Sequence, residues 1–285
     1  MNKLTMLCMY YKDILIDTEC YPYRNIQCGR ASTNIKLDMA GDDTGGNISK
    51  ENRYWSEITG LYWAWKNIEK TEFVGLCSYR RFFNLKASNM PIELQGSKNA
   101  GQHVRDINYE ILDDVFKQSD VVLPVSYSYA WSIRRVCSMN YKDKDFSALK
   151  EMIKEVQPEY LGTYNNMMYK SNKMIGHNMF IMKWDDFQNY CEWVFSILMP
   201  LSEVINPKDY PISQVRVYGY MHELLLAVYC SHNKFRVSES QLLWINDEID
   251  SVRFNKAYYR VFSSIVYGVT SMLGRFYPHV ISNKK

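Results

Sequence analysis

Two adjacent arginines follow a run of apolar residues in the segment Phe73-Val-Gly-Leu-Cys-Ser-Tyr-Arg-Arg-Phe-Phe83. The run is typical of a strand buried in a parallel sheet, and ligands of open α/β sheets bind beyond the carboxyl ends of such strands. Because guanidinium groups match phosphate geometry, Arg80 and Arg81 are candidates for binding a diphosphate, with Tyr79 beside them. If the extended conformation persists, only one arginine faces the ligand, and the other forms a structural ion pair.

A second polar segment, Gly41-Asp-Asp-Thr-Gly-Gly-Asn-Ile-Ser49, combines two carboxylates with flexible glycines. Its composition indicates a loop, after which Ser49 can cap a helix. The side chains of Asp42, Asp43 and Asn47 could bind the hydroxyl groups of a sugar, and the free backbone N–H groups could bind a phosphate. The alternative is a solvated turn that is capped by its own Asp or Asn side chains.

A helix predicted over about residues 213–230 has one apolar face and one polar face, and the polar face carries Arg216 and Glu223. Glu223 is a candidate general base towards a hydroxyl group. The alternative is an Arg–Glu ion pair on a solvated helix face. Another polar pair, His177 and Asn178, stands at the head of a buried strand.

The elements expected around these residues alternate between apolar strands and amphipathic helices. Strands are predicted over residues 4–11, 73–79, 121–125 and 178–183, and helices over 50–69, 108–118, 184–204 and 213–230. This alternation predicts an α/β fold with a mostly parallel central sheet that is flanked by helices.

Composition excludes several classes of protein. A chain of 285 residues that is 47% hydrophobic and 23% charged can bury a core and is not disordered. The net charge of +3 is too small to imply nucleic-acid binding on charge alone. The seven cysteines lack CxxC spacing, so we interpret them as reduced, mostly buried thiols, and no His/Asp/Glu cluster predicts a metal site. No hydrolase elbow, P-loop or dinucleotide fingerprint is present.

The last residues, 251–285, contain no acid but retain arginines and lysines among aromatic and aliphatic side chains. Residues 261–274 are uncharged, an interval shorter than the about 20 residues that span a membrane. The pattern favours a tail that lies on a membrane surface, and the alternative is a helix docked on the protein's own core.

Together these segments resemble a family of bacterial proteins that are found with capsule and O-antigen synthesis genes and are regarded as glycosyltransferases. The matching segments follow the family's order over about residues 4–240. They are Gly41-Asp-Asp-Thr-Gly-Gly-Asn-Ile-Ser49, Glu57-Ile-Thr-Gly-Leu-Tyr-Trp-Ala-Trp-Lys-Asn67, Gly75-Leu-Cys-Ser-Tyr-Arg-Arg-Phe-Phe83, Asn178-Met-Phe-Ile-Met182, Tyr190-Cys-Glu-Trp193 and Arg216-Val-Tyr-Gly-Tyr-Met-His-Glu-Leu-Leu225. Ser78 and Tyr11-Lys12 depart from the family, which usually has histidine before Tyr-Arg-Arg and His-Lys after the first strand.

The resemblance implies a single GT-A-like, Rossmann-like domain over residues 1–250, followed by the helical tail 251–285. It implies transfer of a hexose or galactofuranose from a UDP-sugar to a lipid-linked or growing bacterial surface polysaccharide. By analogy, Ser78 to Arg81 occupy the place of an Asp-x-Asp metal motif, so arginine cations would neutralise the departing diphosphate. No metal is then required, although Asp42 and Asp43 leave Mg²⁺ or Mn²⁺ open. The resemblance also implies that Glu223 is the base.

The expected roles fall into three groups. Catalytic roles are expected for Glu223, Asp42 and Asp43, nucleotide and diphosphate binding for Tyr11, Lys12, Tyr79, Arg80 and Arg81, and sugar or acceptor binding for Asn47, His177, Asn178 and Arg216. The expected location is cytoplasmic, peripheral on the inner face of the plasma membrane, with no nucleic-acid partner. Two rival functions stay open: a non-catalytic glycan-binding scaffold protein, and a sugar phosphotransferase.

Overall fold

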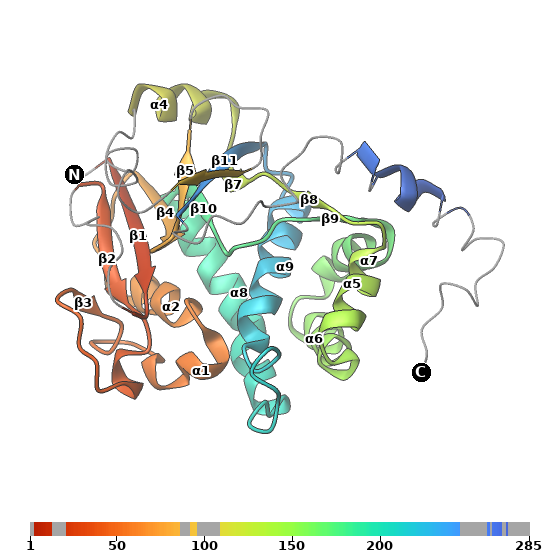
Figure 1. Cartoon of the computed structure of the whole chain (residues 1–285), viewed down its shortest axis with the longest axis horizontal. Helices are drawn as coiled ribbons and strands as arrows, with labels where there is room; N and C mark the ends of the chain where they lie inside the picture. Colours follow the sequence, from red (N-terminus) through yellow and green to blue (C-terminus); the bar gives the residue numbers. More distant parts are fainter. Residues whose placement is uncertain are drawn as a thin grey trace.

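A nine-stranded sheet separates one helix from a larger group of helices (Figure 1). The computed structural model describes residues 3–12, 21–85, 92–95, 109–245, 261–262, 264–269 and 272. The strands of the large sheet are β1 (Leu4–Tyr10), β2 (Tyr23–Gln27), β3 (Ala40–Gly41), β4 (Phe73–Ser78), β5 (Arg81–Asn84), β6 (Ile92–Gln95), β7 (Val121–Pro124), β10 (Phe180–Lys183) and β11 (Val237–Ile245). A separate two-stranded sheet pairs β8 (Tyr127–Ser128) with β9 (Lys173–Met174).

The large sheet is mixed, which corrects the prediction of a mostly parallel one. Strand β1 pairs in parallel with β2 and β4, and β11 pairs in parallel with β6 and β7. However, β10 lies antiparallel between β4 and β7, and β5 lies antiparallel to β11. A short apolar run buried on both faces carries no mark of strand direction, so the sequence pattern cannot distinguish the two cases.

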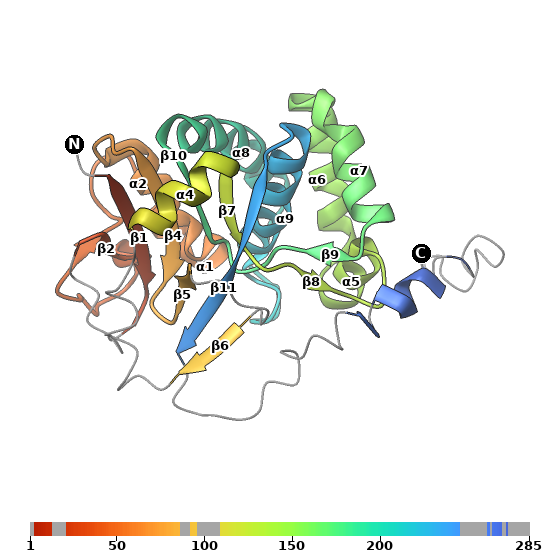
Figure 2. The same cartoon turned by 90° about the horizontal axis from the view of Figure 1, so that it is seen from above.

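Helices cover both faces of the sheet. They are α1 (Asn52–Trp55), α2 (Ile58–Asn67), α4 (Tyr109–Gln118), α5 (Ile133–Asn140), α6 (Asp143–Val156), α7 (Leu161–Lys170), α8 (Trp184–Val204) and α9 (Val217–His232). Figure 2 shows α4 crossing the face of the sheet opposite to α8 and α9, with α5, α6 and α7 beyond α9.

Alternation along the strands explains the two layers of helices. In β4, Val74 and Leu76 belong to the apolar cluster that contains α2, α8 and α9, whereas Phe73 and Cys77 belong to the cluster with Leu112 and Phe116 of α4. Successive side chains of a strand point to opposite faces, so one strand contributes to both cores.

Most of the predicted elements are present, with three local corrections. The predicted helix over 184–204 is α8, but the one over 50–69 is divided at Ser56, whose φ of 53° interrupts it. Ser49 does not cap a helix with its side chain: its hydroxyl donates to Asp42 and accepts from the backbone N–H of Ala31. The predicted helix over 213–230 begins later, at Val217.

Six cysteines are buried free thiols, and the seventh, Cys20, lies outside the described residues. In the tail, residues 261–262, 264–269 and 272 are helical and expose several apolar side chains. These are Val261, Phe262, Ile265, Val269 and Met272. The basic residues predicted for the tail, including Arg253, Lys256, Arg260 and Arg275, lie outside the described residues. Within the described part of the chain, no helix is both long and apolar enough to cross a membrane.

Candidate active site

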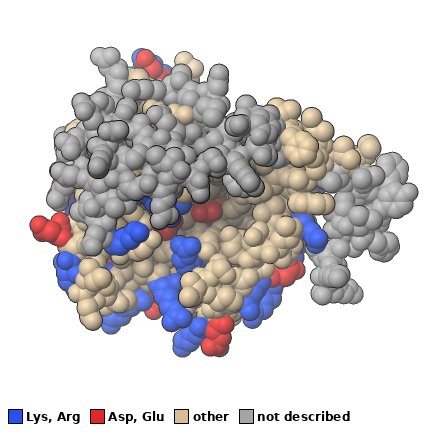
Figure 3. All heavy atoms as spheres, viewed as in Figure 1, with Lys and Arg blue, Asp and Glu red and all other residues tan. Residues whose placement is uncertain are grey.

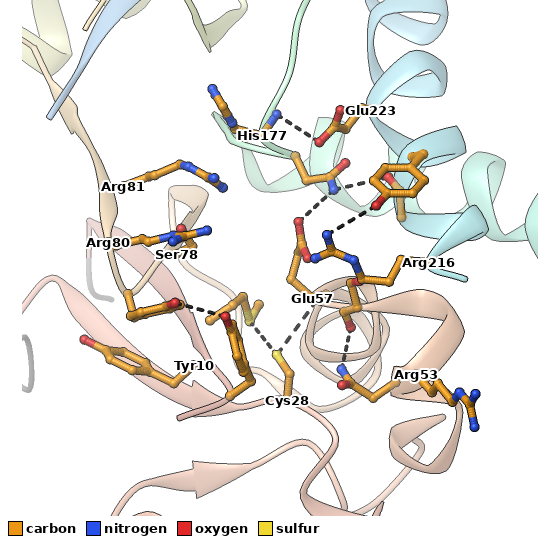
Figure 4. A pocket seen from close by; sticks show the side chains of 18 of the residues that line it. Tyr10, Cys28, Arg53, Glu57, Ser78, Arg80, Arg81, His177, Arg216 and Glu223 are labelled. Atoms are coloured by element: carbon orange, nitrogen blue, oxygen red, sulfur yellow. Dashed lines mark hydrogen bonds between the residues drawn. The ribbon is translucent and has the colours of Figure 1, made fainter. Parts of the chain in front are cut away.

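A cavity of about 490 Å³ opens at the edge of the sheet where β1 and β4 end (Figure 4). Because β10 runs antiparallel to β4, it starts at this same edge, and the residues just before it, His177 and Asn178, line the cavity. Helix α1, the junction between α1 and α2, and the first two turns of α9 close the other side. The position is the one at which α/β sheets bind ligands.

Both arginines of the Tyr-Arg-Arg motif line the cavity. The expectation that only one of them faces a ligand depended on a persisting extended conformation, and this condition is not met. The extended conformation ends at Ser78, which pairs with Arg81 across a tight turn into β5. Neither arginine forms an ion pair within the described residues. Two cations without carboxylate partners suit an anionic ligand.

Arg81 is held in place largely by non-ionic contacts. Its guanidinium carbon lies 4.5 Å from the centroid of the Trp244 ring, at cation–π distance. Its Nε is buried and has no hydrogen-bond partner in the described structure. Burial, and then the neighbouring charge of Arg80, lower the pKa of Arg81. Both causes penalise the charged form, and an anion placed in the cavity would relieve them.

Glu223 projects from the second turn of α9 into the cavity. Its Oε1 accepts a hydrogen bond from the backbone N–H of His177 at 3.1 Å. Burial, and then the charge of Glu57, raise the pKa of Glu223 to about 7, whereas the His177 hydrogen bond, Arg81 and Arg216 act in the opposite direction. A carboxyl group with this pKa can accept a proton near neutral pH.

Arg216 does not form the ion pair with Glu223 that was the alternative prediction. It stands at the N-terminus of α9, where its guanidinium donates to the hydroxyl of Tyr220 at 3.2 Å. Both Arg216 and Tyr220 line the cavity. The positive charge of Arg216 is therefore available to a ligand.

His177 and Asn178 have φ values of 76° and 52°, a conformation that is costly for residues other than glycine. This turn directs the His177 ring towards Tyr127, whose hydroxyl lies 2.6 Å from Nε2. Burial, and then Arg81 and Arg80, lower the pKa of His177 to about 3. The ring is therefore neutral at physiological pH and acts as a hydrogen-bonding group.

Glu57 enters the cavity from the junction of α1 and α2, next to the left-handed Ser56. The start of α2 packs closely on the sheet at Gly60, where an added Cβ would lie 2.5 Å from the sulfur of Met9 and 2.7 Å from that of Cys28. The Glu57 Oε1 accepts a hydrogen bond from Nδ2 of Asn178 at 2.8 Å. The cavity thus contains two carboxylates as well as its arginines.

The model of the family described as "Domain of unknown function (DUF4422)" matches residues 5–234. The chain belongs to the DUF4422 family. The chain is also similar to the apo structure of the WbbM bifunctional glycosyltransferase, with a TM-score of 0.74 and 24% identity. The match covers 88% of this chain and 48% of the WbbM chain, so this chain spans about half the length of that protein. At this identity the likeness shows a shared fold. No curated protein matches the chain.

Most of the predicted site residues of this DUF4422 chain meet at the cavity. Those that line it are Tyr11, Tyr79, Arg80, Arg81, His177, Asn178, Arg216 and Glu223. The hydroxyls of Tyr11 and Tyr79 lie 3.1 Å apart. Lys12 is beside them, with its Nζ 5.6 Å from the centroid of the Tyr79 ring.

None of the residues 41–49 lines the cavity, and their polar side chains make contacts within the fold. Asp42 is fully buried, and its carboxylate accepts hydrogen bonds from the backbone N–H groups of Gly29 and Arg30 and from the Ser49 hydroxyl. These contacts position the loop and do not fit the catalytic role expected for Asp42.

The neighbours of Asp42 likewise make contacts within the loop region. Asp43 Oδ1 lies 3.9 Å from Nε of Arg30, and Asn47 Oδ1 accepts from the backbone N–H of Ser49. Neither residue lines the cavity. Among the described residues, no group of three or more His, Cys, Asp or Glu side chains could hold a metal ion.

The predicted site residues did not include Glu57 and Tyr220, which line the cavity of this DUF4422 protein, or Tyr127 and His222, which contact residues of its lining. Glu57 opens one of the family segments, but it was included in a predicted continuous helix, and only the break at Ser56 turns it into the cavity. Tyr127 and His222 are linked to the cavity by contacts with residues 50 and 44 positions away. Sequence spacing along one element cannot reveal such contacts.

Proposed function

We propose that this DUF4422 protein is a glycosyltransferase that moves a hexose or galactofuranose from a UDP-sugar to a hydroxyl of a lipid-linked or growing bacterial surface polysaccharide. One observation carries the proposal: Arg80 and Arg81, without carboxylate partners in the described structure, share a cavity with Glu223, whose pKa is about 7. A diphosphate leaving group and an acceptor hydroxyl need these two kinds of group.

In the proposed reaction the acceptor oxygen bonds to the anomeric carbon as the bond from that carbon to the diphosphate oxygen breaks. The acceptor proton passes to Glu223, and the electron pair of the broken bond leaves with the diphosphate. Negative charge then grows on the diphosphate, where Arg80 and Arg81 stabilise it. Figure 3 supports the electrostatics, because Lys and Arg side chains gather around a hollow in which acidic atoms are visible.

A nucleoside can lie beside the diphosphate, on the rim formed by Tyr11 and Tyr79. Tyr11 is 60% exposed although it follows a buried strand, so its ring is open to stacking. The Lys12 ammonium lies close to both rings and can bind a phosphate. On this proposal the donor needs no metal, since the arginines neutralise its diphosphate.

The tail supports a further part of the proposal, that the enzyme works on the inner face of the plasma membrane beside a lipid-linked acceptor. Its helical residues present exposed apolar side chains, with Phe262 59% and Ile265 61% exposed. An exposed apolar helix face suits the interface between headgroups and acyl chains. Replacement of both residues by aspartate should abolish flotation of the full chain with vesicles that contain anionic lipid. Unchanged flotation would contradict this part of the proposal.

The activity itself is tested by incubating the protein with UDP-sugars and acceptor glycans and measuring the masses of the products by mass spectrometry. A sugar increment on the acceptor that disappears in Glu223→Gln supports the proposal. A phosphate-containing increment identifies a sugar phosphotransferase instead. Glycan binding without any product, and unaffected by Glu223→Gln, identifies a scaffold protein.

A further inference from the structure

A line of buried polar side chains leads from the core to Glu57. The hydroxyl of Tyr190 on α8 lies 2.9 Å from Nε2 of His222 on α9. The other ring nitrogen of His222, Nδ1, lies 2.7 Å from Oδ1 of Asn178. Nδ2 of Asn178 then donates to Oε1 of Glu57 at 2.8 Å. Tyr190 and His222 are fully buried, so these two side chains have no access to solvent, whereas Asn178 and Glu57 line the cavity.

The chemistry of the partners fixes the direction of every hydrogen bond in this line. Nδ2 of Asn178 faces the Glu57 carboxylate and, at 3.3 Å, the carbonyl of Gly219, and both of these groups only accept. Oδ1 of Asn178 must then accept from Nδ1–H of His222. Burial lowers the pKa of His222 to about 3, so the ring holds one proton and its Nε2 accepts from the Tyr190 hydroxyl. All the donors therefore point towards Glu57.

These contacts occupy one oxygen of Glu57 and leave the other for a ligand. No described residue donates a hydrogen bond to Oε2, and Glu57 lines the cavity. Two positive-φ residues, Ser56 before it and Asn178 against it, restrict its position. In Figure 4 the carboxylate lies across the cavity from Arg80 and Arg81, with Glu223 nearby.

We propose that Glu57 binds a hydroxyl group of the donor sugar through Oε2, and that Asn178, His222 and Tyr190 are positioning residues that hold it there. The inference rests on the proposed function. If the arginines bind the diphosphate and Glu223 binds the acceptor hydroxyl, the donor sugar occupies the space that Glu57 faces. A carboxylate suits this site because it accepts strong hydrogen bonds from hydroxyl groups.

Calorimetry on the full chain tests the role of Glu57. The probes are UDP, UDP-glucose, UDP-galactose, UDP-N-acetylglucosamine and UDP-galactofuranose. In Glu57→Gln the amide oxygen continues to accept from Asn178, which turns the amide nitrogen, a donor only, towards the sugar. The Kd of the preferred UDP-sugar should rise about tenfold to hundredfold, because a charge-assisted hydrogen bond is lost. The Kd of UDP should stay within about twofold, because the diphosphate site is intact.

Tyr190→Phe tests the positioning line, with Tyr164→Phe as its matched control. Both variants remove one buried hydroxyl, but that of Tyr164 donates to the backbone carbonyl of Phe146 and has no link to Glu57. Only Tyr190→Phe should raise the UDP-sugar Kd, by about threefold, with the Kd of UDP unchanged. If the Tyr190 hydroxyl only stabilised the fold, both variants would have a lower unfolding temperature and the same Kd for the UDP-sugar.

The outcomes separate this inference from the function on which it rests. Wild-type sugar affinity in Glu57→Gln would overturn the role of Glu57, and so would an equal loss of UDP and UDP-sugar binding, which would indicate a disturbed cavity. Equal UDP-sugar Kd values for Tyr190→Phe and Tyr164→Phe would overturn the positioning line. If the wild-type protein binds neither UDP nor any of the four UDP-sugars, the proposed function itself is overturned.

Discussion

The cavity and the loop 41–49 are both rich in polar and charged side chains, but their polar groups are bound in opposite ways. In the loop, the buried carboxylate of Asp42 accepts three hydrogen bonds from the loop and its neighbours. In the cavity, Arg81 Nε, Ser56 Oγ and Ser78 Oγ are buried and have no partner within the described structure. A polar group that is already satisfied stabilises the fold, whereas one that lacks a partner is ready for a ligand.

The cavity lowers the stability of the fold, and this free-energy cost supports the view that its polar groups are kept for a ligand. A buried polar group without a partner costs about 1–3 kcal/mol, and a residue forced to positive φ has a cost of similar size. Among the described residues, four other than glycine have a positive φ: Ser56, His177 and Asn178 line the cavity, and Lys234 does not. Backbone strain therefore gathers at the cavity, as is typical of functional sites, together with three unpartnered polar atoms, whereas Asn165 Oδ1 and Trp193 Nε1 lack a partner elsewhere in the described structure.

The largest expected effect tests whether the cavity performs catalysis. Glu223→Gln removes the proton acceptor but keeps the shape of the side chain, so transfer should fall by about 10²- to 10⁴-fold. Turnover is measured by mass spectrometry of the product, and the Kd of UDP by calorimetry. The matched control is Glu192→Gln, on the exposed side of α8, which should keep full activity. Full transfer activity in Glu223→Gln would show that Glu223 is not the catalytic base.

The next effect concerns the two arginines that lack carboxylate partners. Arg80→Ala and Arg81→Ala should each raise the Kd of UDP by about 10- to 100-fold, because each removes charge-assisted hydrogen bonds to phosphate. Lys154→Ala, which removes an exposed cation on α6, is the control and should leave the Kd unchanged. Calorimetry at two salt concentrations measures the effect. If all three variants bind UDP alike, the diphosphate lies elsewhere.

The loop should respond in stability and not in binding. Asp42→Asn removes the charge and makes one of the accepting oxygens a donor, so the free energy of unfolding should fall by about 2–3 kcal/mol. Asp43→Asn is the neighbouring control, and its contact with Arg30 is long and partly exposed, so the change should stay below about 0.5 kcal/mol. Urea unfolding measures both, with the Kd of UDP alongside. A large rise of that Kd in Asp42→Asn, with stability intact, would return Asp42 to the active site.

The cavity and the loop 41–49 also show which parts of the fold and of the site could be predicted from the sequence. Local patterns predicted strands β1, β4, β7 and β10 and helix α8. Residue types at a strand end and on a helix face singled out Arg80, Arg81 and Glu223, and the resemblance to a family strengthened the role of Glu223 as the base. The sequence could not show that Asp42 is structural and Glu223 lines the cavity. A loop whose polar side chains bind a ligand has the same composition as one whose polar side chains bind the protein's own backbone. Nor could the sequence reveal the contact of Glu57 with Asn178, since 121 positions separate them. The direction of β10, which brings Asn178 to the cavity, comes from tertiary structure alone.

The last and smallest expected effect is a shift in the pH dependence of transfer, which tests how Glu57 influences Glu223. As a base, Glu223 must be deprotonated, and its pKa is raised to about 7, so transfer should fall about tenfold per pH unit below that value and level off above it. Stability should move in the opposite direction. A carboxyl pKa above its ordinary 4.5 stabilises the fold fully below about 4.5, and this contribution is lost as pH rises through about 7.

Burial is the main cause of the raised pKa of Glu223, and the charge of Glu57 is the second. Glu57→Gln removes this second cause and leaves the burial in place. The Arg81 and Arg216 charges and the His177 hydrogen bond, which lower this pKa, remain. The acid limb of kcat/KM should therefore move to lower pH, and at pH 6 the variant should keep a larger fraction of its own maximum than the wild-type protein. Glu69→Gln, which removes an exposed charge beyond the end of α2, should leave the limb unmoved. A limb shared by all three proteins would mean that the charge of Glu57 does not affect the pKa of Glu223.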